Sequence, residues 1–469
     1  MSTPLSAESL VAPHTLPGWI KQGLIAVGVI AACWGGAIVW WHVSARVPAT
    51  REWMLLLFGL PSTVLLAGFG ARQWIAQRSA AVPAETIDVA PTYPACSAER
   101  PLQAHYLAVL ATALRAPYGA SAEELAAAIA DNKARPDLDR ELVDDDGFPV
   151  MCARCPDARD DALREDVTGW LAAHGIADPH FSDEQWRALT LGTSVASELA
   201  GRAAIEWIVR DVAAPTLQVM PLLPADWTAA QRDAAAAWLR QTAAQAGWQG
   251  EIALAAADAD PAAGIAQLAG VVAAGDESGV TLVVACASHV GGGTVVRWAS
   301  DRTLFTSIQA QGMMPGEGAA GLLLGGAALA AASDGGAVVL LAPLGQAQDD
   351  STADVRRRDD ARPFKELVER TLAHADVDAA DVAMIVADTG HRARHVLELT
   401  EYASTAMRQL DGGADVVRVG AAGGHSGIVA FVTALALAPH YVAGRQAPVL
   451  CIANEMPGRR LAALVRLAA

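Results

Sequence analysis

The stretch that most constrains the fold is a glycine-rich turn near the C-terminus, followed by a long apolar run. Residues 420–427 read GAAGGHSG, and Ile428–Ala438 contains no charged residue. A turn of small residues that leads into a helix too apolar to face water is typical of a buried helix in a layered α/β domain. The upstream chain fits this class, because strand-like and helix-like segments alternate there with short glycine-containing connections.

Composition limits the classes of function. The chain of 469 residues has room for two or three domains, and hydrophobic residues make up 53% of it against 18% charged residues. The formal net charge of −17 argues against nucleic acid as a partner, because phosphate binding needs a basic surface. The run Arg356–Arg358 is followed at once by Asp359 and Asp360, so it predicts a solvated loop.

Two apolar segments near the N-terminus are long enough to cross a membrane. Residues 22–45 contain no charged side chain apart from the titratable His42, and residues 53–71 contain none. As a helix, each spans a hydrocarbon core of ~30 Å. A signal peptide is the alternative for the first segment, but the second follows closely and no small-x-small cleavage site precedes Trp40. We therefore predict two transmembrane helices within an N-terminal segment of residues 1–78. Tryptophans suited to interfacial anchoring lie near their ends: Trp19, Trp34, Trp40, Trp41, Trp53 and Trp74.

A two-helix hairpin puts both of its ends on one side of the membrane. Lys21, Arg72 and Arg78 flank the outer ends, against Arg46 and Arg51 in the connecting loop. This difference of one charge favours cytoplasmic ends. We therefore expect an inner-membrane protein whose body faces the cytoplasm. Residues 79–97, rich in alanine and proline, predict a linker between the hairpin and the body.

The six cysteines predict neither disulfides nor a zinc site. Cys152 and Cys155 form one C-x-x-C pair, but a structural zinc site needs a second ligand pair, which the chain lacks. A redox pair is the alternative to a packing role for these two. Cys286 and Cys451 lie in apolar strand-like runs, where a thiol acts as a small hydrophobe.

Beyond the linker we expect an N-terminal α/β region of residues 98–215 and a second region of residues 216–469. Residues 137–149 predict an acidic loop, whose spacing does not match a calcium-binding EF-hand. Ser121 and Ser182 are predicted helix N-caps. The predicted strands are Ala104–Leu110, Thr216–Pro224, Glu251–Ala257, Gly279–Ser288, Ala319–Ala331, Ala337–Leu344, Val382–Ala387, Asp415–Gly420 and Pro448–Asn454, the last core strand. The predicted helices include Ser121–Asn132, Leu189–Val212, Asp226–Gly247, Pro261–Ala274, Pro363–Ala373 and His395–Leu410.

Two motifs of the second region resemble the thiolase-fold condensing enzymes of the β-ketoacyl synthase family. That family carries Pro-Gly-Glu-Gly-Ala-Ala, which residues 315–320 repeat, and a Gly-His-Thr-Gly-Ala-Ala-x-Gly turn, which residues 420–427 resemble. The resemblance implies a thiolase-like layered α/β body with two pseudo-repeat halves. Within it, Glu317 is expected to be a fold residue that accepts hydrogen bonds from backbone amides across the half-repeat.

The same resemblance implies a nucleophilic cysteine on a strand-to-helix elbow and two catalytic histidines. The elbow falls in residues 255–262, AAADADPA, which contain neither cysteine nor serine. The first histidine belongs just after the strand Val382–Ala387, where the chain reads DTGH and His391 arrives late. The second is replaced by Ala421 when the turn glycines are aligned. A pseudoenzyme is therefore expected.

Other residues near these positions fill the roles poorly. His391 and His425 are candidate catalytic residues, each close to a vacated position. Cys286 lies inside a strand and not on an elbow, and His289 beside three glycines is expected to be a loop histidine. Glu398 or Glu401 resembles an acidic residue that follows the first histidine in the family.

No cofactor or metal site is predicted. The chain has no GxGxxG that follows a strand and opens a helix, no GxxxxGK[ST] phosphate loop and no G-x-S-x-G elbow.

A membrane hairpin before a catalytically empty thiolase-like body resembles the type VI secretion lipase adaptor (Tla-type) family. The features that carry this resemblance are Pro101-Leu102, His105–Leu110, Asp145–Val150, Pro221–Trp227 and the second half of the chain. The resemblance implies a non-catalytic adaptor that binds a phospholipase effector and delivers it to the spike protein of the secretion machine. Two alternatives remain: a membrane-anchored acyltransferase that uses His391, His425 or Asp258, and a structural homodimer that forms through a sheet edge.

Overall fold

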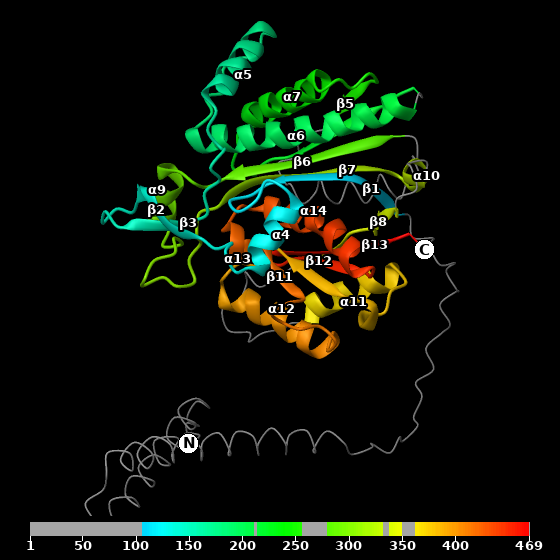
Figure 1. Cartoon of the computed structure of the whole chain (residues 1–469). Helices are drawn as coiled ribbons and strands as arrows, with labels where there is room; N and C mark the ends of the chain where they lie inside the picture. The colour runs from blue at the N-terminus through cyan, green and yellow to red at the C-terminus, as the bar shows by residue number, and fades with distance from the viewer. Residues whose placement is uncertain (1–105, 211–212, 256–278, 332–336, 349–361, 469) are drawn as a thin grey trace, which may run out of the picture. The chain divides into compact units, whose positions relative to one another are not determined.

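The computed structural model describes residues 106–210, 213–255, 279–331, 337–348 and 362–468. The predicted transmembrane segments, the linker and the predicted helix Pro261–Ala274 lie outside these residues. A mixed sheet of 11 strands runs through the described body (Figure 1), and helices cover its faces. The predicted α/β class is therefore confirmed for the body.

The first half of the sheet contains the strands β1 (Leu107–Arg115), β4 (Leu217–Leu222), β5 (Ile252–Leu254), β6 (Val280–Ser288) and β7 (Glu317–Gly326). Their order is β5-β4-β6-β7-β1. β5, β4 and β6 are parallel, whereas β7 is antiparallel to both β6 and β1.

The second half repeats this topology. β11 (Val416–Arg418), β10 (Met384–Ala387) and β12 (Val449–Ala453) are parallel, and β13 (Arg459–Leu467) is antiparallel to β12. β8 and β9, at Val339–Leu341 and Gly345–Gln348, both pair antiparallel with β13 and so correspond to β1. The halves join where β1 pairs with β8 over two residues of each strand. The repeat divides the chain between β7 and β8, so the predicted boundary after residue 215 falls inside the first half.

Helices form three layers around these strands (Figure 1). α6 (Asp183–Arg210) and α7 (Ala229–Gln245) cover the outer face of the first half. α11 (Arg362–His374) and α12 (Ala393–Ala406) pack with the strands of the second half. α14 (Ile428–Arg445) lies between the two halves, against β6 and β7 on one side and β10 and β12 on the other.

α14 is the buried helix that the glycine-rich turn predicts. Every residue from Ile428 to Ala438 is buried, and one apolar core joins this helix to strands of both halves. In the described part of the chain, α14 alone is long and apolar enough to span a membrane, yet 67% of it is buried inside the body.

Several local predictions are confirmed. Ser121 caps α4 (Ala122–Ala130) by accepting the N–H of Glu124, and Ser182 accepts the N–H of Gln185 at the start of α6. α6 then continues for 28 residues, and so joins two stretches that the sequence suggested separately.

The predicted acidic loop at residues 137–149 is wrong. It contains β2 (Asp137–Val143), which forms a hairpin with β3 (Pro149–Cys152). The hairpin holds an acidic residue inward, because Asp139 accepts the N–H groups of Glu141 and Leu142 and pairs with Arg154 at 2.7 Å. Asp139 is therefore buried and paired, whereas Asp137, Glu141, Asp145 and Asp146 are exposed, as the predicted solvated surface requires.

Other boundaries also need correction. The predicted strand Ala319–Ala331 is β7 followed by the short helix α10 (Ala327–Ala331), and β12 is not the last core strand because β13 follows it. The helices α5 (Asp161–Ala173) and α9 (Gly292–Ser300) were not predicted.

Candidate functional site

Three segments meet at one edge of the second half. β10 and β12 are parallel neighbours, so the residues that follow them lie together at their carboxyl ends. The turn before α14 completes the group and encloses a cavity of about 20 Å³, which has room for about one water molecule. The described residues that line this cavity are Met313, Met314, Asp388, Gly390, His391, Arg392, Gly420, Gly424, His425, Ser426, Gly427, Ala430 and Glu455.

Glycines allow these segments to approach closely. A Cβ on Gly420 would lie 2.0 Å from the carbonyl oxygen of Asp388, and one on Gly316 would lie 2.1 Å from that of Gly423. Gly424 and Gly427 have φ angles of +67° and +59°, which favour glycine. The turn is therefore fixed by backbone contacts with both the end of β10 and the Pro-Gly-Glu-Gly segment.

Asp388 occupies the first position after β10, where the resemblance places a catalytic histidine. Its Oδ1 accepts the backbone N–H groups of Asn454 at 2.7 Å and Glu455 at 3.2 Å, so it ties β10 to β12. Its Oδ2 has no hydrogen-bond partner among the described residues, and the side chain is only 1% exposed. Burial, with a further contribution from the charge of Glu455, raises the pKa of Asp388 to about 7.

Glu455 carries the negative charge of the site. It accepts the N–H of Gly390 at 2.8 Å, pairs with Arg392 through both the Nε and Nη2 atoms, and lies 3.1 Å from Nδ1 of His395. Burial alone would raise the pKa of Glu455, but His395 and Arg392 lower it to about 2. The pKa values of the two carboxyls after β10 and β12 are therefore shifted in opposite directions.

Asn454 connects the site to α12. Its side chain is fully buried, accepts the hydroxyl of Thr389 at 2.6 Å and donates to Glu398 at 3.1 Å. Glu398 also pairs with Arg460 at 3.2 Å. Of the two glutamates that the sequence suggested, Glu398 thus belongs to this network, whereas Glu401 lies exposed on α12.

His391 lies at the cavity but makes few polar contacts. Its ring meets that of Phe305 edge-on, with centroids 5.1 Å apart. Its Nε2 is buried and, in the described part of the chain, has no hydrogen-bond partner. Burial lowers the pKa of His391, so the ring is neutral at neutral pH.

His425 stacks on a second histidine. Its ring lies 5.4 Å from that of His289 with an angle of 24° between the planes, and both contact Trp298. Burial lowers the pKa of His425 to about 3 and that of His289 to about 4. His289 is therefore part of an aromatic cluster, and not only the loop histidine that was expected.

Glu317 is a buried fold residue, as predicted. It accepts the backbone N–H of Cys155 at 2.7 Å and the hydroxyl of Ser288 at 2.8 Å, and forms a two-pronged pair with Arg187. These partners all belong to the first half, so the bonds do not cross the half-repeat as expected.

The C-x-x-C pair has a packing role. Cys152 donates to Asp139 at 3.0 Å, and Cys155 packs beside Glu317; both thiols are buried. Burial, reinforced by the nearby carboxylates, raises the pKa of each thiol, which disfavours the reactive thiolate. Cys286 is likewise buried, inside β6, and its pKa is raised to about 12.

Most of the elbow position follows β5 outside the described residues, and so does Asp258. No three His, Cys, Asp or Glu side chains of the described ranges lie close enough together to hold a metal ion. The structure brings His391 and His425 to one cavity. Sequence reasoning missed Asp388, Asn454 and Glu455, which could have been found because residues that follow parallel strands gather at one edge.

Comparisons with known proteins find solved structures whose fold is similar to that of the body. No protein-family model and no curated protein sequence matches the chain. The ketosynthase from module 6 of the bacillaene synthase of Bacillus subtilis 168 is similar with a TM-score of 0.56 and 12% identity, over 78% of this chain and 72% of that chain. The oxazolomycin ketosynthase domain OzmH KS7 of Streptomyces albus JA3453 gives 0.57 and 12%, over 78% and 74%. The body has a ketosynthase-like fold.

A chain of the AntDE:AntF complex, a type II polyketide synthase acyl-carrier protein with its ketosynthase, is also similar, with a TM-score of 0.56 and 12% identity over 78% of this chain and 100% of that chain. At such identities the likeness describes the fold and not the activity of the ketosynthase-like body.

Proposed function

We propose that this chain is a non-catalytic adaptor, built on a ketosynthase-like scaffold, that binds a lipase effector and loads it onto the spike of a type VI secretion system. The observation that carries the non-catalytic part is the content of the vacated site. Asp388 stands where one catalytic histidine is expected, and Ala421 stands at the other position. The cavity that Asp388 lines has room for about one water molecule.

The chemistry of the remaining groups supports this proposal. An acyl-transfer site needs an activated nucleophile and donors aimed at a developing oxyanion. Residues 255–262 supply neither cysteine nor serine, and the described thiols are buried with raised pKa values. Burial lowers the pKa of His425 to about 3, so its ring is a weak base.

The adaptor part rests on the resemblance of residues 98–469 to the Tla-type family and on the predicted membrane hairpin. Function can be carried by the surface of a fold whose original site is lost. A net charge of −17 favours a partner with a basic face and speeds the encounter with it. A tether in the inner membrane would raise the effective concentration of the body near an envelope-bound machine.

Co-purification tests the adaptor function. The full chain, extracted in mild detergent from cells that carry its neighbouring genes, should bring down a lipase and a spike protein. Disruption of the empty site by His391→Ala should leave this capture unchanged. Loss of capture in that variant, or the absence of both partners from the wild-type sample, would contradict the proposal.

One observation favours a second candidate, a membrane-anchored acyltransferase with a rearranged site. Asp388 Oδ2 and His391 Nε2 are both buried, lack partners among the described residues and line the same cavity. A protonated carboxyl and a neutral imidazole in one cavity can act as an acid and a base. Incubation with acyl thioesters followed by intact-mass measurement distinguishes the two functions. The adaptor predicts no adduct and no turnover, whereas a covalent acyl group or thioester hydrolysis lost in Asp388→Asn would establish the enzyme.

A further inference from the structure

The last turns of α6 expose three large aliphatic side chains. Ile205, Ile208 and Val209 are 65%, 64% and 73% exposed, and their i, i+3, i+4 spacing places them on one face of the helix. Other apolar residues of α6, such as Leu199 and Trp207, are buried in the core of the first half. We call the three exposed residues the α6 stripe.

A groove opens beside the α6 stripe. It has a volume of about 440 Å³, and the residues that line it include Ile205, Val109–Ala111 of β1, Val338 and Val339. Contiguous exposed apolar surface of this kind marks an interaction site in a soluble body. Ile205 belongs to both the stripe and the groove, so the two adjoin.

Charges at the groove are already balanced. Arg202 pairs with Glu198 at 2.6 Å, and Arg210 pairs with Glu206 at 2.7 Å while lying over the ring of Trp207. Both pairs are i, i+4 neighbours on α6 itself. The occupant of the groove is therefore recognised by apolar contact and not by a strong charge of its own.

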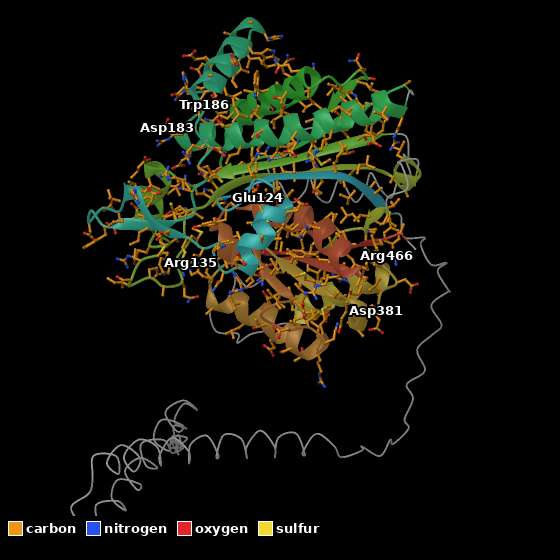
Figure 2. All side chains as sticks on the ribbon, in the orientation of Figure 1. Glu124, Arg135, Asp183, Trp186, Asp381 and Arg466 are labelled. Carbon is orange, nitrogen blue, oxygen red and sulfur yellow. The ribbon has the colours of Figure 1, made fainter. Side chains whose placement is uncertain are left out.

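The chain enters the body beside this surface. The described body begins at Tyr106, whose ring lies under the guanidinium of Arg466 at 4.7 Å, and β1 forms the groove floor from Val109 onward. Figure 2 shows Arg466 on the side of the body opposite Asp183, the first residue of α6, and so on the side toward which α6 runs. The tether that precedes Tyr106 therefore attaches next to the groove.

The length of that tether limits what the groove can meet. Residues 22–45 and 53–71 predict two membrane-spanning helices, and a linker of the length of residues 79–97 has a root-mean-square reach of roughly 25 Å. A chain anchored in this way keeps its groove near the bilayer surface at a high effective concentration.

We propose that the α6 stripe and the adjoining groove dock onto the lipid bilayer, with the three aliphatic side chains at the boundary between headgroups and acyl chains. The body then lies against the membrane and does not swing freely on its linker. This inference goes beyond the adaptor function and rests on the predicted membrane hairpin, but not on the identity of any cargo.

Cleavage of the linker tests the proposal. The full chain, with a protease site inserted in residues 79–97, is reconstituted into uncharged phosphatidylcholine vesicles at about one chain per vesicle. After cleavage, the wild-type body should float with the vesicles. The fraction of the body released from the vesicles should be about 10-fold larger for the variant Ile205→Glu/Ile208→Glu/Val209→Glu than for the wild type. The control Leu397→Glu, which changes a 64% exposed leucine on α12, should stay bound.

Three further readings make the outcome decisive. Alkaline extraction before cleavage checks the membrane hairpin separately, and near-ultraviolet circular dichroism checks that each variant is folded. The released wild-type body should also float with fresh vesicles that lack the tether. Release of the wild-type body to the same extent as the triple variant would overturn the proposal. Binding only to vesicles that retain the cleaved tether would assign the groove to residues of the tether, and binding that appears only at high chain density would assign it to a second copy.

Discussion

Asp388 shows how one residue can change the character of a site. Its position after β10 would suit an imidazole, but its carboxyl accepts two backbone N–H groups from the segment after β12 and is almost fully buried. The residue therefore stabilises the join between two strands. Its partners lie 66 and 67 residues further along the chain, so the sequence around Asp388 did not reveal them.

Replacement of Asp388 by asparagine should change how stability depends on pH. The folded pKa of about 7 lies above the unfolded value of 3.8. The contribution of Asp388 is therefore complete below about pH 4 and is lost as the pH rises through about 7. Asparagine keeps an oxygen for both N–H groups but cannot ionise. Between pH 5 and pH 8, we expect the free energy of unfolding of Asp388→Asn to increase by on the order of 2 kcal/mol relative to that of the wild type, measured by urea unfolding.

Asp411 provides the matched control. It is an exposed carboxylate that accepts the N–H groups of Gly413 and Ala414, which lowers its pKa. The free energy of unfolding of Asp411→Asn should therefore differ from that of the wild type by a constant amount over the same pH range. A similarly constant difference for Asp388→Asn would show that Asp388 is ionised throughout.

Glu317 and Arg187 form the other residue-scale feature, a buried ion pair whose side chains are nearly inaccessible. Glu317→Gln should cost about 3–5 kcal/mol of unfolding free energy, because it leaves the guanidinium buried without its counter-charge. The exposed pair Lys365–Glu369 on α11 is the comparison, and Glu369→Gln should change stability by at most about 0.5 kcal/mol. Equal effects in urea titrations would mean that Arg187 gains water or another partner.

Among the elements, α14 and its preceding turn were the most predictable part of the fold. An uncharged apolar helix is stable only when it is buried, so the sequence of this run was enough to predict that α14 lies in the interior. The β2–β3 hairpin was missed for the opposite reason. Its sequence is acidic, and an inward Asp139 is stabilised by partners that the sequence pattern did not reveal: two backbone N–H groups, the Cys152 thiol and the Arg154 guanidinium. Likewise, the site network depends on contacts between β10, β12 and α12 that no single segment encodes.

The turn before α14 gives the element-scale prediction. Gly420→Ala should destabilise the protein by about 1–3 kcal/mol, because the new methyl would overlap the carbonyl oxygen of Asp388. Gly423→Ala, in the same turn, is the control: a methyl there meets no atom of the described residues within 4 Å, and its φ is not positive. Thermal unfolding should separate the two variants. A Gly423→Ala that is as damaging as Gly420→Ala would indicate a requirement for backbone freedom and not for space.

For the whole molecule, the main feature is that both halves share α14. The apolar core around this helix includes Leu322 and Val283 from the first half and Val386 and Cys451 from the second. Each outer layer adds its own core, around α6 and α7 or around α11 and α12. The halves are therefore topological repeats but should not be independent in stability.

Truncation of Phe431, a fully buried residue of α14, should test this dependence. Phe431→Ala should cost about 3–5 kcal/mol. It should also raise amide hydrogen exchange by a similar factor in β6 and in β12, because both strands pack against the same helix. Faster exchange confined to β12 would show instead that the first half folds without α14.

The narrow strand contact between the halves has a consequence for engineering. Within the sheet, only Leu107 and Ala108 of β1 pair with β8. Backbone hydrogen bonds also link Met314 and Gly316 to His425, and the rest of the join is the packing of side chains around α14. A backbone break introduced between α10 and β8 would cut none of the strand pairing of the described residues. Two fragments expressed separately should then reassemble around the apolar helix that one of them carries, which makes this protein a candidate for split-reporter complementation.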